Sequence, residues 1–194
     1  MKIYFLKSDL NQYQIFPKPK NIDDFIELDL EIENESILNT HCIVECNGEF
    51  KLVSKPESTL QKWDGEKWII DEAKLAEQQN EVWEKIKEKR YKNGLGGVYI
   101  ERVGKWFQTG EEEKTKYLGL DKVIDKINEI DWKCADNTFV KMNRTLLDEI
   151  FLQMVVTENA DHVNAEKHRI EMMKSTNPLD YNFSTGWSAN YEQV

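Results

Sequence analysis

The stretch from Asn143 to about Lys174 constrains the fold most, because its pattern predicts one long helix. Large apolar residues recur at the three- and four-residue spacing of a helix with one buried face. They are Leu147, Ile150, Phe151, Met154 and Val155, continued more weakly by Val163, Ile170 and Met173. Asn143 suits the N-cap, with Thr145 and Asp148 as an alternative capping pair, and Pro178 marks the end of helical structure. Such a helix needs a second layer against which to bury its apolar stripe.

Residues 71–92 predict a second helix, because they lack Gly and Pro and are rich in good helix formers. Leu75, Val82 and Ile86 form only a thin apolar stripe. The stripe is compatible with a short oligomeric seam but does not establish a coiled coil. The glycines at 94–97 then end the helix. No Lys-Ser/Thr pair follows them, so we interpret this segment as a hinge and not as a phosphate-binding loop.

Residues 1–70 predict a small antiparallel, β-rich module. Short aromatic and β-branched runs occupy 2–6 and 13–16. Between Ile26 and Glu33, apolar and acidic residues alternate, which places four apolar side chains on one face and four carboxylates on the other. Seven of the 36 acids lie in 21–36, where there is no base. We interpret this face as solvated; the alternative is an acidic docking surface for a basic partner.

Two hairpins are expected within this module. In the first, a three-residue loop of Cys46, Asn47 and Gly48 would place Gly48 in the left-handed conformation and pair Glu45 with Glu49. This register gives the hairpin a buried face made of Cys42, Val44, Phe50 and Leu52.

The second hairpin has Asp64-Gly65 as its expected two-residue turn. Trp63 would then pair with Glu66 and Trp68 with Gln61, so that both tryptophans are diagonal neighbours on one face. We favour a structural role for the pair, capping a small sheet. Stacking on a sugar is the alternative.

The C-terminal half mixes short strands with helices. We expect a hairpin at 98–109, which turns at Gly104 and gathers Val98, Ile100 and Phe107 on one face. A helix over 111–118 follows, and then an amphipathic helix carried by Val123, Ile124, Ile127 and Ile130. Residues 132–142 predict a short extended or hairpin segment, with Asp136-Asn137 at its turn. The predicted class is α+β, divided into a β-rich module (1–70), a connecting helix (71–92) and a C-terminal α+β domain (93–194).

The polar residues indicate no metal, cofactor or catalytic site. His41, Cys42 and Cys46 are close in sequence, but their segment has the pattern of a strand. Cys42 and Cys46 would then be roughly 13 Å apart, too far for two ligands of one zinc ion. We therefore expect buried thiols. His162 and His168 have no Asp, Ser or Cys partner at a useful spacing, so we interpret them as ordinary residues of the helix face.

The charge excludes some classes of partner. A formal net charge of −10 on 194 residues argues against non-specific nucleic-acid binding and against a polybasic membrane-surface protein. No apolar run approaches the roughly 20 residues of a membrane span, and the first residues lack a signal-peptide core. The three cysteines fit a reducing cytosol. We expect neither nucleic acid nor membrane as a partner.

The final segment is too aromatic for a free tail. It carries Tyr181, Phe183, Trp187 and Tyr191, which we expect to pack onto the C-terminal domain or onto a partner chain. We favour docking on a partner within an assembly. The candidate partner-binding residues are therefore these four together with Trp63 and Trp68.

A set of motifs in the second half resembles a known family. They are Gly96-Gly97-Val98, Gly104-x-x-Phe107-x-Thr109, Trp132-Lys133-x-x-Asp136-x-x-Phe139, Asn143, His162 and Gly186-Trp187, in that order. This region, residues 93–194, is similar to a phage and prophage domain of unknown function at the C-terminus of tail-fibre and tail-fibre-assembly proteins. The chain departs from that pattern at Gly110, Met142 and Ser188.

The resemblance implies a setting and no reaction, because the family has no established catalytic residues to carry over. It implies a non-enzymatic phage tail protein, either a tail-fibre-associated component or an assembly chaperone, that docks on other proteins. The implied partner is a tail-fibre or baseplate protein, and a homo-oligomer stays open. The implied location is the virion tail, or the host cytoplasm during assembly. The alternative is a receptor-binding module that recognises a cell-surface carbohydrate through exposed aromatic residues.

Overall fold

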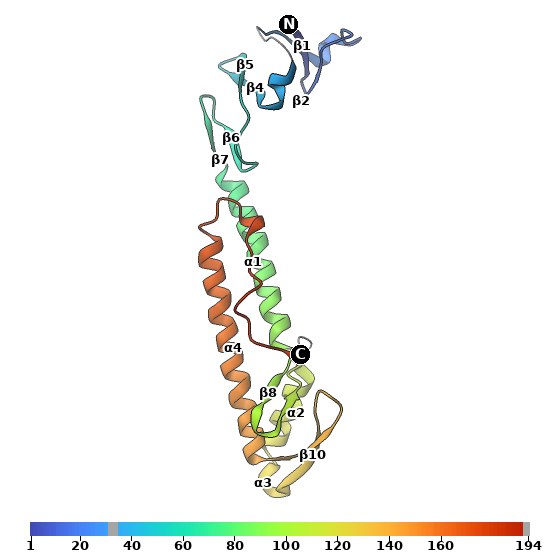
Figure 1. The fold of residues 1–194 in the computed structure, drawn as a ribbon, viewed down its shortest axis with the longest axis vertical. Helices are drawn as coiled ribbons and strands as arrows, with labels where there is room; N and C mark the ends of the chain where they lie inside the picture. The colour runs from blue at the N-terminus through green and yellow to red at the C-terminus, as the bar shows by residue number, and fades with distance from the viewer. Residues whose placement is uncertain (31–34, 192–194) are drawn as a thin grey trace. The chain divides into compact units, whose positions relative to one another are not determined.

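The computed structural model describes residues 1–30 and 35–191 and confirms the α+β class (Figure 1). The chain divides into two compact units, residues 1–75 and 76–194. Each unit has its own hydrophobic core. Within the described ranges, none of the helices combines the length and the apolar character that crossing a membrane requires.

A three-stranded antiparallel sheet in the order β2-β1-β3 opens the first unit. Its strands are β1 (Lys2–Leu6), β2 (Asp9–Gln14) and β3 (Phe25–Asp29), with short 3-10 turns at Ile22–Asp24 and Glu35–Asn39. Ile3 and Phe5 of the central strand are fully buried in the core of this unit. Strand β3 begins one residue before the predicted alternating strand, and residues 31–33 of that prediction lie outside the described residues.

The first predicted hairpin is present, but its register is different. Strands β4 (His41–Cys46) and β5 (Glu49–Ser54) pair Cys46 with Glu49, so the loop is the two residues Asn47 and Gly48. Our three-residue loop was wrong. Asn47 and Gly48 both have positive φ, 53° and 84°, as the turn that matches strand twist requires, and Asn tolerates this conformation.

This register also corrects the buried face of the first hairpin. Ile43 lies opposite Leu52 and packs with Leu52 and Phe50 in the core, whereas Val44 lies opposite Lys51. Ile43 and Val44 are both buried, so β4 is covered on both faces. Alternation alone cannot select the inward face of such a strand.

The second hairpin has a longer loop than predicted. Strands β6 (Gln61–Trp63) and β7 (Trp68–Ile70) place Trp63 directly opposite Trp68, so the loop is residues 64–67 and the predicted two-residue turn was wrong. The Asp64 carboxylate accepts hydrogen bonds from the backbone amides of Glu66 and Lys67, at 2.9 and 2.8 Å. These bonds satisfy the loop amides and lower the pKa of Asp64.

The second unit is built around two long helices (Figure 1). Its elements are α1 (Glu72–Gly94, which starts in the first unit), β8 (Val98–Ile100), a 3-10 turn (Glu101–Val103), β9 (Lys105–Phe107), α2 (Glu111–Asp121), α3 (Ile124–Ile127), β10 (Glu129–Lys133), β11 (Phe139–Asn143), α4 (Arg144–Met172) and a 3-10 turn (Pro178–Asp180). The predicted hairpin over 98–109 is confirmed as β8–β9, and of the two alternatives for 132–142 the structure has the hairpin, β10–β11. Val98, Ile100 and Phe107 are all buried, as predicted.

The helix predicted from Val123 to Ile130 was wrong in extent. Only Ile124–Ile127 is helical, because Asn128 adopts a positive φ of 63° that ends the turn. Ile130 belongs to strand β10, where it pairs with Met142. The four apolar residues have helical spacing although they belong to a short helix and to the strand after it. Over so few residues, periodicity cannot distinguish a helix from a strand.

Helix α4 starts where predicted, and its buried face is apolar in the first half but includes polar residues in the second half. Asn143 is the N-cap, and its side chain accepts a hydrogen bond from the amide of Leu146 at 3.0 Å. In the first half, Leu147, Ile150 and Met154 face the core. In the second half, the buried residues are Asp161, Ala165, His168 and Met172. The predicted continuation through Val163, Ile170 and Met173 was wrong, since all three are exposed.

Candidate functional site

The second half of α4 lies beside α1, and the C-terminal segment covers both helices (Figure 1). We call residues 177–191 the C-terminal strap. Its residues Tyr181, Phe183 and Trp187 pack on a buried cluster from the two helices. The cluster consists of Val82 and Ile86 of α1 with Ala165 and Met172 of α4. The thin α1 stripe through Val82 and Ile86 is therefore used inside the unit.

His168 is held by the strap through both ring nitrogens. Its Nε2 donates to the carbonyl oxygen of Thr185 at 2.9 Å, since that oxygen can only accept. Its Nδ1 shares a hydrogen bond with the Tyr181 hydroxyl at 2.9 Å. The Trp187 ring stacks on the imidazole, with centroids 5.8 Å apart and planes inclined by 24°. His168, predicted to be an ordinary residue of the helix face, is instead a buried anchor for the strap.

Asp161 anchors the last part of the strap. This carboxylate is 1 % exposed and accepts from Asn93 Nδ2 at 2.6 Å and from the Ser188 amide at 2.8 Å. Asn93 Nδ2 also donates to the Ser188 carbonyl oxygen, and Asn190 donates to Asn93 Oδ1 at 3.1 Å. A buried charge is stable only when it is fully hydrogen-bonded. The network therefore fixes the end of α1, the middle of α4 and the strap to one another.

The glycines at the end of α1 are required by close packing. Gly97 has a φ of 90°, and a Cβ there would lie 2.9 Å from the Phe107 carbonyl oxygen. Its amide donates to Thr109 Oγ1, which in turn donates to the Gly94 carbonyl oxygen. A Cβ on Gly96 would lie 2.2 Å from the Cβ of Asn190 in the strap. Gly96 and Gly97 therefore let the strap and the Phe107 backbone pack closely against the chain that follows α1.

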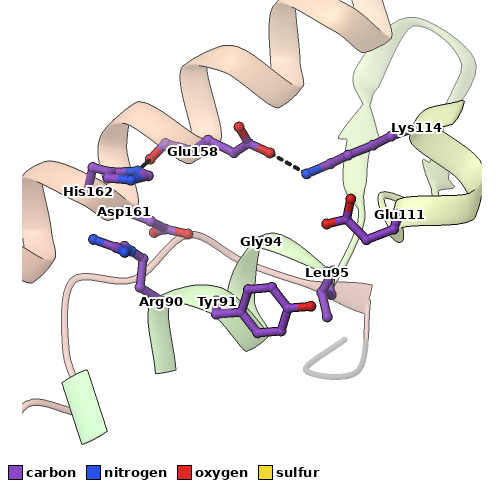
Figure 2. A pocket seen from close by; sticks show the side chains of 9 residues that line it. All are labelled: Arg90, Tyr91, Gly94, Leu95, Glu111, Lys114, Glu158, Asp161 and His162. Carbon is purple, nitrogen blue, oxygen red and sulfur yellow. Dashed lines mark hydrogen bonds and ion pairs between the residues drawn. The ribbon is translucent and has the colours of Figure 1, made fainter. Parts of the chain in front are cut away.

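A pocket of about 210 Å³ lies beside the Asp161 network. Figure 2 shows its lining, with side chains from the end of α1 on one side and from α4 across from them. The lining residues are Arg90, Tyr91, Gly94, Leu95, Glu111, Lys114, Glu158, Asp161 and His162. Its volume is below the roughly 300–1,000 Å³ of typical small-molecule sites.

Part of the pocket's charge is already paired. Lys114 lies 2.6 Å from Glu158, and His162 Nδ1 lies 2.8 Å from the Glu158 carbonyl oxygen. The side chains of Arg90 and Glu111 make no hydrogen bond or ion pair to another described residue. Across the described part of the chain, no three His, Cys, Asp or Glu residues come together as metal ligands.

The six candidate partner-binding residues fall into three places. Trp63 and Trp68 lie in the first unit as an edge-to-face pair, with ring centroids 5.4 Å apart and planes at 71°. Both are half-buried, and Trp68 Nε1 donates to the Ser54 carbonyl oxygen. Tyr181, Phe183 and Trp187 pack inward within the strap. Tyr191 is exposed, with its ring centroid 6.3 Å from that of Trp106.

Helix α4 carries an exposed apolar surface that our assignment of candidate residues missed. Large apolar side chains stand out of α4 on the side away from its buried residues. They are Leu152 (65 % exposed), Val155 (66 %), Val156 (52 %), Val163 (47 %), Ile170 (55 %) and Met173 (50 %). We call this surface the outer face of α4. The sequence did contain a sign of this surface, because the helix has more large apolar residues than a single buried stripe can use.

Comparisons with known proteins place this architecture in a family. Residues 77–185, more than half of the chain, match the domain of unknown function DUF4376. The match takes in most of α1, which we placed outside the resemblance, and it ends just before Gly186-Trp187. No solved structure matches.

A curated relative comes from Haemophilus phage HP1, where it is described as an uncharacterized 23.3 kDa protein in the lys 3′ region. The two are 38 % identical over 116 residues, which is 60 % of this chain and only 54 % of that protein. The relation to a phage protein supports the phage association, whereas the tail-fibre association stays a prediction. On the strength of the match over 77–185, the chain belongs to the DUF4376 family.

Proposed function

We propose that this chain is a non-enzymatic phage protein that works by docking on other proteins. In the finer form of the proposal, it is a tail-fibre-associated component or a chaperone for tail-fibre assembly. It would then reside in the virion tail, or in the host cytoplasm during assembly. The phage relative supports the setting, and the outer face of α4 supports the mode of action.

The outer face carries the proposal because exposed apolar residues on one helix face are costly in water. Burial of apolar surface is worth roughly 25 cal/mol per Å², so a partner that covers six such side chains gains a large driving force. Large contiguous apolar patches on soluble proteins commonly mark interaction sites. The patch follows a single rigid element, which favours a defined contact.

The inner face of α4 is already occupied. Asp161, Ala165 and His168 are buried against α1 and the strap. Three of the four strap aromatics that we expected to bind a partner, Tyr181, Phe183 and Trp187, take part in this internal packing. Among the exposed surfaces of α4, the outer face is therefore the one that we assign to docking.

Capture of partners from infected cells tests the proposal. A tagged chain is expressed during infection, purified, and its bound proteins are identified by mass spectrometry. We expect tail-fibre or other phage structural proteins with the wild type, and their loss with Val156→Asp/Val163→Asp. Leu118→Asp on α2 is the matched control, because Leu118 is similarly exposed at 58 %. Capture of the same proteins by the double variant, or of no phage protein by the wild type, contradicts the docking role.

Two further measurements separate the finer alternatives. Mass spectrometry of purified virions distinguishes a component, present at a fixed copy number in multiples of the fibre symmetry, from a chaperone that is absent. Incubation with host-surface polysaccharide tests the non-enzymatic assignment. Glycan turnover that Glu111→Gln abolishes would refute it, because Glu111 offers an unpaired carboxylate to the pocket.

A further inference from the structure

The outer face of α4 follows the seam pattern of a coiled coil. The positions alternate in steps of four and three and are all exposed. These seam positions are five residues of the outer face, Leu152, Val156, Val163, Ile170 and Met173, together with the polar Asn159 and Glu166. At 1.5 Å per residue, this seam is about 32 Å long. On the opposite, buried side of α4, Met154, Asp161 and His168 also lie seven residues apart. The buried face and the exposed seam therefore follow the same repeat along the helix.

This pattern indicates the shape of the partner. A repeat of 3.5 residues keeps a straight seam only against another helix that supercoils around it. Val156, Val163 and Ile170 occupy the equivalent of the a positions, and β-branched residues there favour two-stranded packing. The d positions are Leu152 and Met173 at the two ends and the polar Asn159 and Glu166 in the centre. A single amphipathic helix therefore fits this face.

The residues that flank the seam carry an unusual charge for this chain. They are Gln153, Val155, Ala160, His162, Lys167, Arg169 and Lys174, and none is acidic. The whole chain has 36 acids against 26 bases. The basic flanks are concentrated in the C-terminal half of the seam. There Arg169 pairs with Glu166 at 3.0 Å and Lys174 with Glu171 at 2.7 Å. Such exposed ion pairs contribute little stability, so both bases can exchange their acids for those of a partner. Flanking charges in coiled coils select partners with opposite charges at the facing positions.

Self-pairing of two α4 helices is unfavourable in both directions. In a parallel pair, Glu166 would face its own copy, and Arg169 would lie beside the Lys174 of the second copy. Like charges in these positions repel. In an antiparallel pair centred on Asp161, Val156 would face Glu166 and Val163 would face Asn159. Each central layer would then bury a polar group without a partner, which costs about 1–3 kcal/mol.

We infer that the outer face of α4 binds an amphipathic helix of another protein whose flanking positions are acidic. The partner supplies an apolar seam, a basic residue that faces Glu166 and an amide that faces Asn159. This inference rests on the proposed docking function and names the class of partner for that same surface. The buried polar contacts fix the register, as a single seam Asn does in natural coiled coils.

A synthetic helix of about four heptads tests this inference. The probe has Ile and Leu along its seam, Asn and Lys at the positions that face Asn159 and Glu166, and Glu at all flanking positions. A second peptide differs only in having Lys at the flanks. Binding to the full chain is followed by fluorescence anisotropy. We expect the acidic peptide to bind, with an affinity that falls as salt rises, and the basic peptide to bind at least tenfold more weakly.

Variants of the chain locate the binding. Val163→Asp should weaken binding of the acidic peptide by roughly tenfold or more, whereas Leu118→Asp should leave it unchanged. Circular dichroism verifies that both variants are folded. Equal binding of the two peptides, or no binding of the acidic one, overturns the inference. So does a dimer of the chain alone, seen by light scattering, that Val163→Asp converts to a monomer.

The peptide test can fail separately from the docking function. If phage proteins are captured by the wild type and lost with Val156→Asp/Val163→Asp, while the acidic peptide does not bind, only the acidic-helix partner is refuted. If that capture fails as well, the docking function is refuted together with it.

Discussion

The buried Asp161 makes the sharpest prediction about what holds the second unit together. In Asp161→Asn, the side chain keeps its shape but exchanges one acceptor oxygen for an NH₂ group. Both partners of Asp161, Asn93 Nδ2 and the Ser188 amide, are donors. One of them will therefore face another donor across a buried contact, whichever way the new amide is turned.

The size of the effect follows from the two hydrogen bonds. A hydrogen bond to a charged group is worth about 1.5–3 kcal/mol, and an unsatisfied buried donor costs about 1–3 kcal/mol. One bond is lost and the other is weakened to a neutral one, so we expect the free energy of unfolding to fall by about 2–3 kcal/mol. For a unit of this size, that corresponds to a decrease in Tm of about 8–12 °C.

Two measurements check this prediction. Urea unfolding gives the loss of stability, and hydrogen exchange shows where it occurs. Exchange should rise most in residues 177–191, because Ser188 and Asn190 lose their attachment to the helices. The matched control is Asp148→Asn on the same helix, where Asp148 is 59 % exposed and its partner Arg144 keeps two other carboxylates. We expect a change within about 0.5 kcal/mol there.

The reasoning is refuted if Asp161→Asn unfolds within about 0.5 kcal/mol of the wild type, or if the strap is no more accessible to exchange than before. Either result would mean that the strap is held by its aromatic residues and not by the polar network.

Three further predictions concern single positions. Burial raises the pKa of Tyr117 above its ordinary value of 10.0. This group therefore contributes stability that is present below pH 10 and lost as the pH rises through the raised pKa. The urea midpoints of Tyr117→Phe should fall less steeply above pH 10 than those of the wild type. Gly97→Ala should lower the free energy of unfolding by about 2 kcal/mol or more in urea titrations, because its Cβ meets the Phe107 carbonyl oxygen at 2.9 Å. Asn143→Ala should cost about 1 kcal/mol in the same assay, because Leu146 loses its cap, and an unchanged midpoint would contradict the capping role.

Several elements of the fold could be predicted from local sequence patterns. The long helix and its Asn143 cap, the α1 helix and the 98–109 hairpin all have strong periodicity or specific end residues. Hairpin registers were harder, because one residue in the turn changes every pairing. For Asn47-Gly48, the competing loops differ only in whether Asn47 also takes a positive φ, which it does at 53°.

The strap network could not be predicted in the same way. Asn93 is 68 residues from Asp161 and 97 residues from Asn190 in sequence, so no local pattern connects them. Asp161 and His168 are polar residues on the buried side of α4, and the apolar stripe therefore leads to the wrong face. The stripe through Val163 and Ile170 was real, but it belongs to the outer face.

Photo-crosslinking during infection tests the central claim most directly. A benzoyl-phenylalanine is placed at Val163 on the outer face of α4, and at Leu118 as the exposed control. The account predicts that Val163 crosslinks to a different phage protein through an acidic helical segment, identified by mass spectrometry, and that Leu118 does not. Crosslinks from Val163 only to a second copy of the chain, or the same products from both positions, would contradict it.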